Sequence, residues 1–134
     1  HVVLYLTMSG VLERFPKLQF VTVETGSAWL AWVMTTMDEI YEKHHMWARP
    51  KLALRPSEFV RRQGHVTFQN DPVGVHCRAF TGVDALVWGS DYPHPEGTWP
   101  ASRESLAAQL AGVPEDEAAK MVGGTAARLF GFAP

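Results

Sequence analysis

Short apolar runs alternate along the chain with longer segments in which apolar residues recur every three or four positions. The short runs are rich in β-branched residues, which is typical of strands of a parallel sheet covered on both faces. Three segments have this pattern: residues 18–24 (LQFVTVE), 65–70 (HVTFQN) and 85–90 (ALVWGS). Their alternation with helical segments predicts an α/β fold of three consecutive parallel βα units joined by right-handed crossovers.

The segments with helical periodicity are bounded by ordinary start and stop signals. Asp71, which precedes a proline, predicts a helix N-cap. Gly10 has a low helix propensity and makes the middle of the first predicted helix less certain. We expect Gly123 and Gly124 to separate the last two predicted helices, and Thr125 to cap the helix that follows them. The predicted helices are residues 2–14, 28–47, 56–63, 71–80, 102–110, 114–121 and 125–130.

The predicted sheet is too small to stand alone. A sheet of three parallel strands has two unpaired edges, and helices cannot cover an edge as a neighbouring strand would. The chain has 134 residues, which suits one domain but not a complete (β/α)8 barrel of about 250 residues. We therefore expect residues 1–134 to form a single partial domain that belongs to a larger sheet.

Composition narrows the classes of partner. Apolar residues make up 46% of the chain and charged residues 19%, which favours a packed core over disorder. The net charge is −2, and no basic run is longer than Arg61-Arg62. Because a nucleic acid or an anionic membrane requires a basic surface, we expect neither as a partner.

The number of cysteines and the length of the apolar runs indicate in which cellular compartment the protein is found. Cys77 is the one cysteine, so no internal disulfide can form, which indicates a reducing, cytoplasmic compartment. No apolar run approaches the ~20 residues that span a bilayer, and none has the pattern of a signal peptide. The sequence begins at His1, inside an apolar run and without an initiator Met, so we expect the natural protein to have an upstream part.

Polar residues follow all three predicted strands. Glu24 ends the first, Asp71 follows the second, and Asp91 follows the third, with His94 three residues later. The carboxyl ends of parallel strands meet at one edge of a sheet, where α/β proteins carry their functional residues. Converging carboxylates suit a divalent cation or a proton-transfer site.

These residues also have simpler interpretations. Glu24 could only favour the N-terminus of the following helix through its dipole, and Asp71 is explained by its role as a cap. Asp91 is harder to explain in this way, because it follows an apolar strand and no helix begins directly after it. His94 could be a ligand, a substrate contact or a loop-packing residue.

The segment WGSDYPH, residues 88–94, resembles the amidohydrolase-related family, in the branch that contains metal-dependent hydrolases and decarboxylases. Three further segments agree in order: GVLERFPKLQF, VETGSAW and TAARLFGF, at residues 10–20, 23–29 and 125–132. The resemblance covers essentially the whole chain. It implies the last part of a TIM (β/α)8 barrel, with residues 18–24, 65–70 and 85–90 as strands six, seven and eight, followed by extra C-terminal helices.

The same resemblance implies a metal site. Family members hold a divalent metal, usually zinc, at the carboxyl face of the barrel. Asp91 matches their aspartate at the end of strand eight, which ligates the metal or handles a proton of the metal-bound water. Glu24 stands where many members have a histidine, and could act as an acid or base. His94 and Trp99, on the loop after strand eight, would shape the substrate pocket.

The departures from the family bear on activity. The H-x-H pair after strand one is missing, and the strand-five histidine would lie upstream of this chain, so Asp91 is the one metal ligand that the resemblance supplies. We predict the C-terminal portion of a metal-dependent hydrolase or decarboxylase that acts on a small carbonyl or carboxylate substrate through a metal-bound water, with metal in the complete barrel. The alternative is a catalytically inactive half-barrel without metal, which forms homo-oligomers or pairs with a chain that supplies the missing barrel half.

Overall fold

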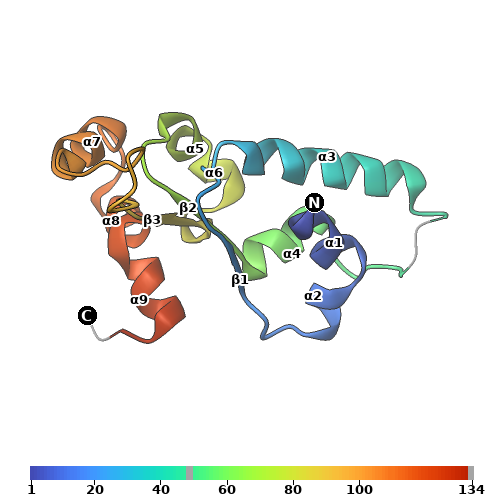
Figure 1. Ribbon diagram of the computed structural model, residues 1–134. Helices are drawn as coiled ribbons and strands as arrows, with labels where there is room; N and C mark the ends of the chain where they lie inside the picture. Colours follow the sequence, from blue (N-terminus) through green and yellow to red (C-terminus); the bar gives the residue numbers. More distant parts are fainter. Residues whose placement is uncertain (48–49, 133–134) are drawn as a thin grey trace.

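The computed structural model describes residues 1–47 and 50–132, and its centre is one sheet of three parallel strands. The strands are β1 (Phe20–Thr22), β2 (Gly64–Phe68) and β3 (Leu86–Trp88), in the order β1-β2-β3 (Figure 1). In the register, Thr22 lies beside Val66, and Val66 beside Leu86. This confirms the predicted fold class. Each strand is shorter than predicted.

Helices surround the sheet, and Figure 1 shows α1, α2 and α4 grouped below the long α3, with α7, α8 and α9 at the opposite end of the molecule. A turn of 3-10 helix (Val83–Ala85) precedes β3. The α-helices of the described residues are α1 (Val2–Met8), α2 (Val11–Arg14), α3 (Trp29–His44), α4 (Pro56–Gln63), α5 (Pro72–His76), α6 (Arg78–Thr81), α7 (Ser102–Gln109), α8 (Glu115–Ala119) and α9 (Thr125–Phe130).

Two predicted helices are split. The segment 2–14 breaks at Gly10, which has φ of 73° and whose missing Cβ would lie 2.7 Å from Pro50 Cγ. A left-handed turn at that close contact favours glycine. The segment 71–80 breaks at Cys77 into α5 and α6.

The C-terminal helices, by contrast, are more continuous than predicted. A five-residue π-helical turn, Lys120–Gly124, joins α8 to α9, so the two glycines do not interrupt the helix as predicted. The predicted cap at Thr125 is also wrong. Thr125 has helical φ and ψ of −66° and −44°, and its buried Oγ1 has no hydrogen-bond partner among the described residues. The continuing helix leaves Thr125 no terminal amide to cap.

The core lies between the sheet and the helices that cover it. Val66, Phe68 and Leu86 are fully buried in the sheet, Met34 of α3 packs on the same cluster, and Met121 joins it from the π-helical turn. The central strand β2 is buried along most of its length, whereas β1 is only half-buried, so its apolar sequence exceeds what the burial in this chain requires. Among the described residues β1 and β3 each pair only with β2, so the outer edge of each is unpaired.

His65 lies in β2, away from the carboxyl ends of the strands, as its place in the sequence predicts. Its side chain is buried, with Nδ1 2.8 Å from the Asp84 carbonyl oxygen and Nε2 3.0 Å from the Gln19 amide oxygen. Burial lowers the pKa of His65 below its ordinary value, and the Asp84 carbonyl opposes this only in part. The ring is therefore a neutral core group.

The lowered pKa of His65 predicts a loss of stability in acid. Above about pH 6.5 the ring is neutral in both the folded and the unfolded chain, whereas below it the unfolded chain takes up the proton first. The free energy of unfolding should therefore fall as the pH drops from about 7 to 5, and less steeply in His65→Gln. Urea titrations of both proteins at several pH values measure this, and an equal slope in the variant would contradict it.

Candidate metal centre

Glu24, Asp91 and His94 converge at the carboxyl end of the sheet. His94 Nδ1 lies 3.1 Å from Asp91 Oδ1 and 3.4 Å from Glu24 Oε1. Ligand atoms from all three lie within 4.8 Å of one another, which no other trio of His, Cys, Asp or Glu achieves in the part of the chain that the structure describes. Glu24 follows β1 and Asp91 follows β3, so residues 67 positions apart meet across the end of β2.

The backbone bends sharply at both carboxylates. Glu24 and Asp91 each have φ of 59°, and they are the two non-glycine residues with positive φ among those described. This left-handed conformation costs a residue with a Cβ roughly 1–2 kcal/mol, and such strain tends to occur at functional sites. The bends end the extended strands and begin the loops that carry the carboxylates to one edge.

The loop after β3 is held by its own backbone. The His94 amide donates to the Asp91 carbonyl at 2.8 Å, the Gly97 amide to the His94 carbonyl at 3.0 Å, and the Thr98 amide to the Ser90 carbonyl at 2.9 Å. A Cβ on Gly97 would lie 2.7 Å from the Ser90 carbonyl oxygen and 3.0 and 3.1 Å from those of His94 and Asp91. The loop therefore closes around a position where only glycine fits.

Burial differs within the group. The Asp91 side chain is 11% exposed, whereas those of Glu24 and His94 are 54% and 53% exposed. Two carboxylates and one imidazole form a mixed oxygen and nitrogen donor set, which suits zinc or manganese better than a softer metal. The residues present therefore fit a divalent ion, with Asp91 as the buried anchor and the other two donors open to solvent.

Trp99, the fourth predicted site residue, lies outside this group. It is on the same loop but 64% exposed, and its ring meets the edge of Tyr92 at a centroid distance of 5.4 Å and an angle of 65°. The structure thus gives the loop an exposed aromatic pair. The substrate contact assigned to Trp99 stays a prediction.

Two positions that hold the loop of Glu24 were not anticipated from the sequence. Thr67 of β2 accepts a hydrogen bond from the Glu24 amide at 3.1 Å through its hydroxyl. Asp71 is the cap of α5 as predicted, since its carboxylate accepts from the Gly74 amide at 2.9 Å, but it also binds residues 27 and 28. No sequence pattern reveals either contact, because the partners are more than 40 residues apart.

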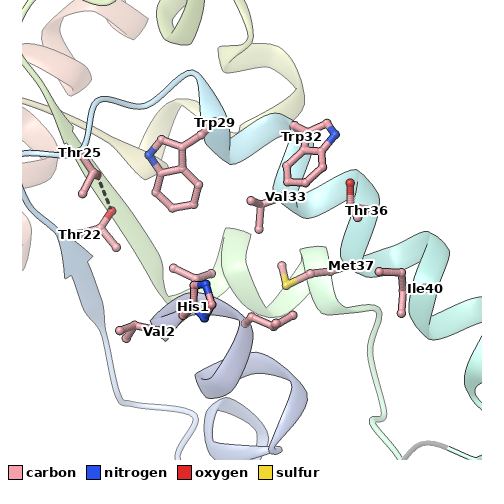
Figure 2. A pocket seen from close by; sticks show the side chains of 12 residues that line it. His1, Val2, Thr22, Thr25, Trp29, Trp32, Val33, Thr36, Met37 and Ile40 are labelled. Atoms are coloured by element: carbon pink, nitrogen blue, oxygen red, sulfur yellow. Dashed lines mark hydrogen bonds between the residues drawn. The ribbon is translucent and has the colours of Figure 1, made fainter.

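A separate apolar cavity of about 590 Å³ lies between α1 and α3 (Figure 2). Trp29, Trp32 and Val33 of α3 face His1 and Val2 across it. Its lining residues include no carboxylate, and His1 is the one lining side chain that could bind a metal or transfer a proton. The Glu24, Asp91 and His94 group brings three such side chains together, so it is the better candidate for chemistry.

A parallel sheet with a polar group at the carboxyl ends of its strands is an arrangement that α/β barrels share with doubly wound α/β folds. The family model Amidohydro_2, described as amidohydrolase, matches residues 1–132. The chain therefore belongs to the amidohydrolase family, which confirms the resemblance seen in the sequence. No curated protein gives a significant match.

Solved structures show the same fold. An amidohydrolase from Mycobacterium avium subsp. paratuberculosis is 26% identical, with a TM-score of 0.79 over 95% of this chain. The 5-carboxyvanillate decarboxylase LigW from Sphingomonas paucimobilis is also 26% identical, with 0.78 over 96%. A dihydroxybenzoic acid decarboxylase from Polaromonas sp. JS666, with bound manganese and the inhibitor 2-nitroresorcinol, is 16% identical, with 0.72 over 96%.

The match covers only part of each of these proteins. The chain spans 32% of the mycobacterial amidohydrolase and 38% of each decarboxylase. It is thus a partial barrel. Among residues 1–47 and 50–132, no helix is both long enough and apolar enough to cross a bilayer.

Proposed function

We propose that this chain is the C-terminal portion of a metal-dependent hydrolase or decarboxylase that acts on a small carbonyl or carboxylate compound. The observation that carries the proposal is the meeting of Glu24, Asp91 and His94 at the carboxyl end of the sheet. Residues from two different strand ends are brought within reach of one ion. This is where barrel enzymes of this kind carry out their chemistry.

The structural neighbours support decarboxylation as the first reaction to test. Two of them are decarboxylases of aromatic acids by name, and one of these holds manganese. Zinc is the metal that the family resemblance implies, and the donor set suits either ion. When bound, such a metal supplies a Lewis acid that activates water or polarises a carbonyl or carboxylate group of the substrate.

The role that we assign to each side chain of the site follows from its exposure to solvent. Asp91, nearly buried and in contact with His94, is the anchoring ligand. Glu24 is half exposed and lies beside the same ring, so it can donate an oxygen to the metal or exchange protons with solvent as an acid or base. His94 serves as a further ligand or substrate contact, and Trp99 offers an aromatic face on the same loop to the substrate.

The proposed activity requires the rest of the barrel. The unpaired edges of β1 and β3 are where further strands would join, and the apolar cavity beside β1 would be covered by them. We propose that a longer chain or a complementary chain supplies these strands in the cytoplasm, where the free thiol of Cys77 is stable.

A second candidate rests on the same edges. Two chains could pair through them as an inactive homo-oligomer, since unpaired strands readily associate. Sedimentation of the purified protein separates the two proposals. Self-association without metal or activity favours the oligomer, and a complex with a second polypeptide favours the enzyme.

A metal titration tests the proposed site in this chain. We expect Mn²⁺, followed by its electron paramagnetic resonance signal, to bind the wild type, and binding to weaken at least about tenfold in Glu24→Gln and in His94→Gln. Glu96→Gln is the matched control, because Glu96 is an exposed acid of the same loop outside the group. Equal weakening in the control would show that Mn²⁺ only follows surface charge.

A further inference from the structure

The Asp71 carboxylate joins two segments that are far apart in the sequence. Its Oδ1 accepts a hydrogen bond from the Gly74 amide at 2.9 Å, which caps α5. Its Oδ2 accepts three more, from the Ser27 amide at 2.6 Å, the Ser27 hydroxyl at 2.9 Å and the Ala28 amide at 2.8 Å. One side chain thus caps its own helix and binds the start of α3.

These contacts exceed what a cap requires. A cap needs one accepted hydrogen bond, whereas three of the four bonds here reach residues 43 or 44 positions earlier. A Cβ on Gly74 would lie 1.9 Å from Ser27 Oγ, so a glycine allows the two segments to meet. Burial alone would raise the pKa of Asp71, but the hydrogen bonds from Gly74, Ser27 and Ala28 together lower it, which keeps the carboxylate ionised.

The segment that Asp71 holds is the one that carries Glu24. Only Thr25 and Gly26 separate Glu24 from Ser27, and Gly26 turns the chain with φ of 63°. The Glu24 amide is bound by the Thr67 hydroxyl of β2 at 3.1 Å. Both ends of this short loop are therefore fixed to β2 and to the residues that follow it.

The same part of the chain also contacts the helix that follows the loop of Asp91 and His94. The buried Gln109, at the end of α7, accepts a hydrogen bond from the Asp71 amide at 3.1 Å and donates one to the Gln69 carbonyl at 2.9 Å. Helix α7 follows the loop that carries Asp91 and His94. Residues 69–71 thus lie between the two loops and bind elements that flank both.

We infer that Asp71 is a positioning residue, which holds the loop of Glu24 at the distance from Asp91 and His94 that metal binding requires. This rests on the proposed function. Asp71 contacts neither the metal group nor a substrate, and it acts through Ser27 and Ala28. A partner that hydrogen-bonds a metal ligand usually changes metal affinity by roughly 10- to 100-fold, and we expect a residue that fixes the loop of a ligand to act in the same range.

Asp71→Ser is the variant that separates positioning from capping. Serine is a good N-cap, so it preserves the start of α5, but its short side chain loses the bonds to Ser27 and Ala28. Asp38→Ser is the matched control. Asp38 accepts from the Ser57 amide at 2.8 Å and the Ser57 hydroxyl at 2.6 Å, the same kind of contact at a site away from the metal group.

We expect Mn²⁺ binding to weaken roughly 10- to 100-fold in Asp71→Ser and to stay within about twofold of wild type in Asp38→Ser. Without metal, amide chemical shifts of residues 24–28 and 91–97 should change in Asp71→Ser and not in Asp38→Ser. Unchanged shifts at residues 24–28 in Asp71→Ser, or equal Mn²⁺ affinity in the two variants, would overturn the inference. A wild type that binds no Mn²⁺ but shows the expected shifts would refute the metal site and leave the positioning role.

Discussion

Replacing Asp91 with Asn should abolish divalent-metal binding and, in the complete enzyme, turnover, while the fold is preserved. Asp91 is the least exposed donor of the group and contacts His94 directly. Asparagine keeps the size of the side chain but removes the negative charge, and it tolerates the φ of 59° at this position. Since loss of an outer-shell partner already costs roughly 10- to 100-fold in affinity or activity, loss of the anchoring ligand should cost more.

Circular dichroism and Mn²⁺ titration of Asp91→Asn measure the two halves of this expectation. Asp84→Asn is the control, because Asp84 is another carboxylate near β3 whose side chain pairs with Arg128 outside the metal group. Asp84→Asn should bind metal as the wild type does. Wild-type metal affinity or turnover in Asp91→Asn would refute the role assigned to Asp91.

Replacing Gly97 with Ala should disrupt the same site through the backbone. The new methyl group would lie 2.7 Å from the Ser90 carbonyl oxygen and about as close to two others, and backbone atoms cannot move aside as a flexible side chain can. We expect the loop to open and to displace Asp91 and His94. Mn²⁺ affinity should fall by about tenfold or more, with stability reduced by about 1–3 kcal/mol.

Gly89→Ala is the matched control for this prediction. Gly89 lies two residues before Asp91, but a Cβ there would meet no atom within 4 Å. The control should bind metal and unfold like the wild type in urea titrations. If Gly97→Ala and Gly89→Ala behave alike, the close packing around Gly97 does not determine the shape of the loop.

The helix α4 shows what the sequence can predict. Its observed bounds, Pro56–Gln63, are those predicted, because proline fixes the first helical position and Glu58 accepts from the Arg55 amide at 2.8 Å. Such signals act over three or four residues. The strands were predicted too long because their ends depend on neighbouring strands, and Glu24 already leaves the extended conformation.

The candidate site, like the fold, could be predicted only in part from the sequence. The meeting of Glu24, Asp91 and His94 followed from one rule, that the carboxyl ends of parallel strands share an edge. The left-handed conformation of the two carboxylates, the packing of Gly97 and the contacts of Asp71 could not be predicted. They depend on segments brought together by the fold, for which the sequence has no local signal.

The central claim is that Glu24, Asp91 and His94 bind one divalent metal, and native mass spectrometry of the protein purified without chelators tests it most directly. The mass reports the chain, any partner chain and any bound metal together. The account predicts one divalent ion per chain in the wild type, alone or in a complex with a complementary chain, and none in Asp91→Asn. A wild type that carries no metal, even after incubation with Mn²⁺ or Zn²⁺, would contradict it.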